Sequence, residues 1–244
     1  NQKMEKIGGV EDLAPGERIY SARFLGNTAY LVTYRQTDPL FVIDLSNPKK
    51  PVVKGELKIP GFSEYLHPID EDTLLGFGRN TVVTQWGDSS EDGLKLSLFD
   101  VSNPSDPKEI SSYLLGNAGS SSDALDNHKA FLYDPQRKLA GFPATIRTAS
   151  GARVGEPWSG DRTVTLSGYL LVKVNEDGFE LYGTLPIEGG DPAEGFQRSD
   201  PANAIERGVY IGNTFYTIAS GRIRAYSLDG LEPLGELVYR SSQP

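Results

Sequence analysis

Four strand-rich units follow one another along this chain of 244 residues, and short motifs return within them. The segment Asp44–Pro51, Asp-Leu-Ser-Asn-Pro-Lys-Lys-Pro, recurs at Asp100–Pro107 as Asp-Val-Ser-Asn-Pro-Ser-Asp-Pro. A Gly-x-Leu motif appears three times on alternating segments, at Gly55–Leu57, Gly183–Leu185 and Gly235–Leu237. A period of roughly 50–70 residues that is built of strands alone is typical of a β-propeller or a similar array.

The alternation of apolar and polar residues predicts an all-β fold, a β-propeller in which four four-stranded antiparallel blades are visible. Residues 18–244 form the propeller region, with blades expected at 18–58, 62–115, 125–187 and 203–239. The Asp-x-Ser-Asn-Pro segments fall between the third and fourth strands of the first two blades. Asp and Asn side chains bond nearby backbone N–H groups, and proline ends a strand ladder, so these segments are predicted to be tight turns.

Residues 1–17 are interpreted as the outer strand and exit of a preceding blade, because Gly9–Gly16 parallels Gly55–Gly61. The fourth blade already has its own outer strand at 231–239, so the extra strand would belong to a blade whose other strands are missing. We therefore expect the chain to be the C-terminal part of a larger propeller of about seven or eight blades. An open array leaves edges exposed, which favours self-association.

The composition argues against several classes of function. A formal net charge of −9 argues against a nucleic-acid-binding protein, which would need a basic surface. The chain has no cysteine, which excludes disulfides and thiolate metal sites. No apolar run approaches the roughly 18–20 residues of a membrane span. The chain opens with Asn-Gln-Lys-Met and shows no targeting signal.

The expected strands place all long connections on one face of the propeller. The connections on the opposite face, such as those at Asn27 and Asn213, are short. Long insertions that collect on one face of a repeat protein often mark its binding face. The Ser-rich run Gly119–Asp123 on this face is expected to be a flexible loop. The four long connections are 80–93, 116–124, 144–165 and 188–202.

Both tryptophans, Trp86 and Trp158, fall on this long-loop face. Exposed tryptophan rings among polar groups suit a protein or carbohydrate partner, because they offer contact area at little entropic cost. The alternative is that each ring only anchors its own connection.

A second set of candidate residues surrounds His128, which is expected at the long-loop end of an innermost strand. Tyr20, Glu64 and Glu206 are expected at the same level, with Asp126 nearby, around the mouth of the central channel. A histidine among carboxylates suits acid–base chemistry or metal binding. The alternative is a hydrogen-bonded residue of the channel wall.

Three segments, Tyr65–Arg79, Leu96–Pro104 and Asp126–Asp134, resemble a bacterial and archaeal family of secreted proteins with a C-terminal β-propeller domain. The resemblance covers roughly residues 16–240, and the family is distantly similar to WD-type repeats. It implies a propeller that is extracellular or associated with the cell envelope. It carries over no catalytic residue.

The leading functional hypothesis is a non-enzymatic binding or scaffold module that binds protein or glycan partners on its long-loop face. The alternative is a glycan-directed hydrolase with carboxylates and His128 at the channel mouth. The sequence contains neither a Gly-x-Ser-x-Gly nor a His-Glu-x-x-His motif. Acidic residues suit Ca²⁺, but no ligand spacing defines a site, so no cofactor or metal site is predicted.

Overall fold

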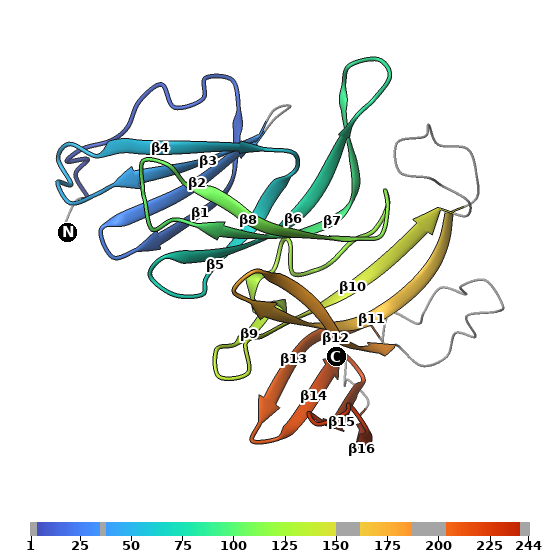
Figure 1. The fold of residues 1–244 in the computed structure, drawn as a ribbon. Coiled ribbons are helices and arrows are strands. Elements are labelled where there is room, and N and C mark those ends of the chain that lie inside the picture. Colours follow the sequence, from blue (N-terminus) through green and yellow to red (C-terminus); the bar gives the residue numbers. More distant parts are fainter. Residues whose placement is uncertain (1–3, 35–37, 150–161, 187–203, 240–244) are drawn as a thin grey trace. The chain divides into compact units, whose positions relative to one another are not determined.

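The computed structural model describes residues 4–34, 38–149, 162–186 and 204–239. In these ranges the regular structure consists of strands β1 to β16 and one 3-10 helix, η1 (Figure 1). The strands form four antiparallel sheets of four strands, and within each sheet the strands follow one another in chain order. The predicted all-β fold with four four-stranded antiparallel sheets is therefore confirmed. No helix in the described part of the chain is long and apolar enough to span a membrane.

The N-terminal unit, Asn1–Leu114, contains the first two sheets. The first sheet consists of β1 (Arg18–Leu25), β2 (Thr28–Tyr34), β3 (Asp38–Asp44) and β4 (Val52–Ile59). The second sheet consists of β5 (Phe62–Pro68), β6 (Thr73–Val83), β7 (Ser89–Asp100) and β8 (Lys108–Leu115). A shared apolar core joins them, in which Val32 and Val42 of the first sheet lie with Leu74 and Phe99 of the second. Strands of both sheets are apolar on this shared side, so the sheets pack face to face.

The C-terminal unit, Leu115–Pro244, contains the other two sheets. The third sheet follows η1 (His128–Ala130) and consists of β9 (Leu132–Asp134), β10 (Leu139–Ala149), β11 (Arg162–Asn175) and β12 (Gly178–Pro186). The fourth consists of β13 (Ile205–Ile211), β14 (Thr214–Ala219), β15 (Arg222–Ser227) and β16 (Pro233–Val238). Their shared core includes Tyr169 and Leu171 of the third sheet and Phe215 and Tyr226 of the fourth.

A single arginine also links the third and fourth sheets. Arg137 forms an ion pair with the buried carboxylate of Asp134, at 2.8 Å, and donates a hydrogen bond to the carbonyl of Gly212, at 3.0 Å. Burial alone would raise the pKa of Asp134, but hydrogen bonds from Arg137 and Gln136 outweigh it and hold the pKa below its usual value. The turn after β9 is therefore fastened to the turn after β13.

The two Asp-x-Ser-Asn-Pro segments form the predicted tight turns between third and fourth strands. In the first, the amide of Ser46 donates to Asp44 and the amide of Lys49 donates to the side chain of Asn47. The second repeats both bonds at Ser102 and Ser105. Hydrogen bonds from Ser46 are the main reason that the pKa of Asp44 falls to about 2.

Residues 4–17 pair with no strand among the described residues, yet they lie along the outer face of the first sheet. Val10 and Leu13 pack against Phe41 and Ile43. A cavity of about 630 Å³ remains beside this segment, next to the exposed side chain of Phe24. The face is therefore only partly covered.

Candidate functional site

The β6–β7 hairpin extends the second sheet beyond the ends of its other strands (Figure 1). The two strands pair as far as Val83 and Ser89, so the predicted loop over 80–93 is wrong. Instead, Thr81–Glu91 form a hairpin arm, named so below. Its run of β-branched residues, Thr81 to Thr84, favours an extended backbone and explains why the ladder continues.

A tight turn closes the hairpin arm and projects Trp86. The amide of Thr84 donates to the carbonyl of Asp88 at 2.7 Å, and the amide of Gly87 donates to the carbonyl of Thr84 at 2.9 Å. Gly87 has a φ of 85°, which a residue without a side chain adopts without strain. The side chains at the tip are open to solvent, with Trp86 81% exposed and Val83 77% exposed.

Charged and polar contacts fix the base of the hairpin arm. Arg79 lies 3.3 Å from Glu64 on β5 and 3.0 Å from Glu91 on β7. The hydroxyl of Thr81 accepts a hydrogen bond from the amide of Gly61, at 2.9 Å. Glu64, predicted to line the channel mouth, therefore helps to hold the arm against β5.

Tyr20, the other predicted channel residue of this unit, belongs to an aromatic cluster. Its ring lies 4.7 Å from that of Phe62 and 5.8 Å from that of Tyr34. Arg18 lies over the same ring, at 5.5 Å. Tyr20 thus lies where the first sheet packs against the second.

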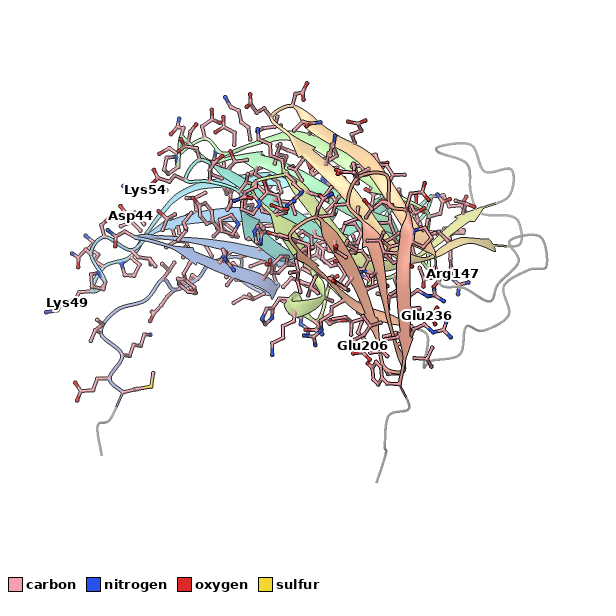
Figure 2. All side chains as sticks on the ribbon, turned by 90° about the horizontal axis from the view of Figure 1, so that it is seen from below. Asp44, Lys49, Lys54, Arg147, Glu206 and Glu236 are labelled. Atoms are coloured by element: carbon pink, nitrogen blue, oxygen red, sulfur yellow. The ribbon has the colours of Figure 1, made fainter. Side chains whose placement is uncertain are left out.

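In the C-terminal unit, His128 lies on η1 and not on a strand. The innermost strand was predicted over 125–133, but in the structure only the end of this range is a strand, as part of β9. Asn127 caps this helix by accepting a hydrogen bond from the amide of Lys129, which favours helical geometry over extension. η1 adjoins β13, which carries Glu206 (Figure 2). Asp126, His128 and Glu206 are all exposed.

The sequence predicted a flexible loop for the Ser-rich run. In the structure this run is instead an ordered segment that pairs with β10. Ser121 exchanges two backbone hydrogen bonds with Thr145, at 2.8 and 2.9 Å. The hydroxyl of the buried Ser122 donates to the carbonyl of Pro143. A pocket of about 90 Å³ lies here, lined by hydroxyl groups and by Asp123. It is large enough for about three water molecules.

Two predicted connections of the long-loop face lie wholly or partly outside the described residues. The connection 188–202 does so entirely, and so does Trp158. Of the connection 144–165, the two ends belong to β10 and β11, so it is shorter than predicted. Within the described ranges, no group of three or more His, Asp or Glu side chains is arranged to hold a metal ion.

Val83 was missed by the sequence analysis, although its β-branched neighbours would have indicated a strand that exposes every second residue.

His67 makes the stability of the N-terminal unit depend on pH. Burial, and after it the charge of Arg23, lower the pKa of His67 from 6.5 to about 4, while Nδ1 lies 3.0 Å from the Tyr65 hydroxyl. Because the unfolded chain binds a proton more readily, the free energy of unfolding should fall as pH drops from about 6.5 to 4, by about 2 kcal/mol. Urea titrations across this range should show the loss.

Two variants test this prediction: His67→Gln, and His128→Gln as its control. The first removes the titrating ring, so its stability should change less between pH 6.5 and 4 than that of the unmodified protein. The second removes a histidine of the C-terminal unit, outside the unit whose unfolding is followed, and serves as the control. Equal pH dependence in all three proteins would contradict the assignment to His67.

Four successive four-stranded antiparallel meanders, packed face to face in pairs, define a protein of the β-propeller class. The chain belongs to the beta propeller domain family, whose sequence pattern it matches over residues 1–231.

Two archaeal proteins are similar in sequence. An uncharacterized protein of Archaeoglobus fulgidus is 37% identical over 237 residues, which is 97% of this chain and 30% of that protein. The uncharacterized protein MJ1554 of Methanocaldococcus jannaschii is 48% identical over 139 residues, which is 57% of this chain and 20% of that protein. The chain thus spans less than a third of the curated relatives it matches.

Among solved structures, AztD of Citrobacter koseri is 14% identical with a TM-score of 0.47, over 91% of this chain and 47% of that one. Hydrazine synthase of Kuenenia stuttgartiensis is 15% identical with a TM-score of 0.45, over 84% of this chain and 50% of that one.

Proposed function

We propose that this chain is a non-enzymatic binding module that holds a protein or glycan partner at the tip of its hairpin arm. The observation that carries the proposal is the exposure of Trp86 and Val83 on a hairpin whose base is fixed by Arg79 and Thr81. A large aromatic ring on a rigid support loses little conformational entropy when a partner covers it. Asp88, exposed in the same turn, provides a charged group at the rim of this surface.

The hydrolase alternative has weaker support. Its carboxylate Glu64 is engaged by Arg79, and its histidine lies exposed on η1. A glycan hydrolase needs two carboxyl groups on either side of the bond that it breaks, and the ion pair with Arg79 occupies the one at Glu64. The family resemblance supports a further proposal, that the protein acts in the cell envelope or outside the cell, which cell fractionation tests.

Trp86→Ala should weaken partner binding about 30-fold, because a central tryptophan at an interface contributes 2 kcal/mol or more. Partners are first identified with the unmodified protein, by a glycan array and by affinity capture with mass spectrometry, and each affinity is then measured for the variant. Val83→Ser should weaken binding less. Neither change should alter thermal stability, since both side chains are exposed.

The control for this experiment is Phe24→Ala, which removes another exposed aromatic ring of the same unit, on β1. It should leave the affinity unchanged. Unchanged binding by Trp86→Ala, or equal losses in Trp86→Ala and Phe24→Ala, would exclude the hairpin arm as the binding surface.

We also infer that these four sheets are part of a larger propeller, of seven or eight blades. Two observations support it. Every residue of β16 is exposed, so the fourth sheet has an uncovered outer strand. Among the described residues, only 4–17 cover the outer face of the first sheet, beside a cavity of about 630 Å³ that the inner strands of a preceding blade would fill.

A further inference from the structure

The repeated Gly-x-Leu motif marks a contact between neighbouring sheets. In β4, a Cβ atom at Gly55 would lie 2.5 Å from the carbonyl oxygen of Pro104, in the β7–β8 turn of the second sheet. In β12, a Cβ atom at Gly183 would overlap the side chain of Leu231, in the β15–β16 turn of the fourth sheet. At both positions the turn between the third and fourth strands of the next sheet occupies the space of a side chain. At Gly55 the overlapping atom is backbone, so glycine is required there, whereas at Gly183 it is the end of a leucine side chain.

The leucine of each motif completes the contact. Leu57 packs against the core that the first and second sheets share. Leu185 is 3% exposed and belongs to the core that the third and fourth sheets share. We call this pair of positions a seat, in which the glycine receives the next turn and the leucine enters the next core.

Residues 8–10 form a seat of the same kind before the first sheet. A Cβ atom at Gly8 would overlap the carbonyl oxygen of Pro48 and lie 2.9 Å from the carbonyl carbon of Lys49, both in the β3–β4 turn. Val10, two residues on, packs against the outer face of the first sheet. The seat is thus occupied at three places along the chain.

Gly235 and Leu237 in β16 have the geometry of a seat without an occupant. Gly55, Gly183 and Gly235 each directly follow the extra residue of a β-bulge in the fourth strand, and they pair with Val42, Leu171 and Ala225 of the third strand respectively. The backbone of β16 is therefore in the same register as that of β4 and β12. Yet no atom of the described residues lies within 4 Å of a Cβ atom built at Gly235, and Leu237 is 60% exposed.

We propose that Gly235 and Leu237 dock a further four-stranded sheet, with its turn between third and fourth strands against Gly235 and its apolar face over Leu237. The proposal rests on the larger propeller inferred above, and it names the surface and the kind of partner. Leu234 and Val238, also exposed on β16, extend the apolar area that such a sheet would cover.

The occupant to which we commit is a blade of the same polypeptide. The curated relatives are more than three times as long as the stretch they share with this chain, which leaves ample length for further blades. The seat also continues an interface that the chain forms within itself. A second copy could offer only the β11–β12 turn of its third sheet, because the turns at Pro48, Pro104 and Leu231 already lie against glycines of their own chain.

The test measures the reactivity of a thiol introduced as Leu237→Cys, in the 244-residue chain and in the intact polypeptide that carries it. In the short chain, which has no cysteine of its own, the thiol should react with a maleimide as an exposed group does. In the intact polypeptide it should react at least tenfold more slowly, as judged by peptide mass spectrometry. Lys50→Cys, in the exposed β3–β4 turn, is the control and should react equally in both.

A second variant, Gly235→Ala, tests docking at Gly235 through thermal stability and needs no chemical label. It should leave the melting temperature of the 244-residue chain unchanged or slightly raised, and lower that of the intact polypeptide by about 4 °C. Gly55→Ala, in an occupied seat, should lower both.

Two results would overturn the proposal. Equal reactivity of the introduced thiol in both proteins would show that no sheet docks at Leu237. Protection that disappears on dilution would show that a second copy is the occupant. Electron microscopy of the intact polypeptide tests the larger propeller independently of docking at Gly235 and Leu237. If the images show a ring of seven or eight blades while the introduced thiol stays reactive, only the docking proposal is refuted. If they show no such ring, the larger propeller is refuted.

Discussion

Gly78→Val is expected to lower the free energy of unfolding of the N-terminal unit by about 3 kcal/mol. A Cβ atom at this position of β6 would overlap the carbonyl oxygen of Phe62 and lie 2.7 Å from the Cα atom of Ser63. Both are backbone atoms of β5, the strand that pairs with β6 through Ser63 and Gly78. Because backbone cannot rotate aside as a side chain can, relief of the clash would break this ladder. Urea unfolding followed by circular dichroism measures the loss.

The matched control is Gly235→Val in the same 244-residue chain, where the new side chain meets no atom within 4 Å of its Cβ. Valine favours an extended backbone, so this change should be neutral or slightly stabilising. If both variants lost stability to the same degree, the cost would come from replacing a strand glycine as such. The steric argument at Gly78 would then be wrong.

Tyr169→Ala should destabilise the C-terminal unit by about 3–5 kcal/mol, since it leaves a cavity at the centre of a core. Tyr169 is fully buried, and its ring lies 5.3 Å from that of Phe215. Two glycines make room for it: a Cβ atom at Gly141 would lie 2.7 Å from its Cε1 atom, and one at Gly208 would lie 2.6 Å from its Cζ atom.

Tyr169→Phe separates the ring from its hydroxyl group. Burial raises the pKa of Tyr169 well above its usual value, so the buried group is a neutral phenol. Removing the hydroxyl should change the free energy of unfolding by no more than about 1 kcal/mol. Thermal unfolding of the two variants measures the difference. A loss in Tyr169→Phe as large as that in Tyr169→Ala would show that the hydroxyl, and not the ring, stabilises this core.

The features that the sequence predicted best depend on local chemistry. The Asp-x-Ser-Asn-Pro turns form because Asp44 and Asn47 bond amides two residues away, which requires no distant partner. The four sheets were predictable for a related reason, since alternation within each strand and short turns between strands determine a meander.

The features that it predicted poorly depend on partners far along the chain. Glu91, Asp92 and Gly93 are typical of a loop, but Glu91 pairs with Thr81 across the hairpin arm, and this pairing extends β6 and β7. The Ser-rich run also has a loop-like composition, and it is ordered by Thr145, more than twenty residues away. The predicted ring of Tyr20, Glu64, His128 and Glu206 draws residues from both units and stays a prediction.

The seats also have a consequence for symmetry. At Gly55 the contact between sheets joins a strand backbone to the carbonyl of Pro104, with no side chain between them to absorb a change in spacing. At Gly55 the angle by which one sheet is rotated from the next is then set by two backbones, whereas at Gly183 the side chain of Leu231 lies in the contact. A ring closes only when these angular steps add up to a full circle. The number of blades in a complete ring would therefore follow from the size of the residue at one position in each outermost strand.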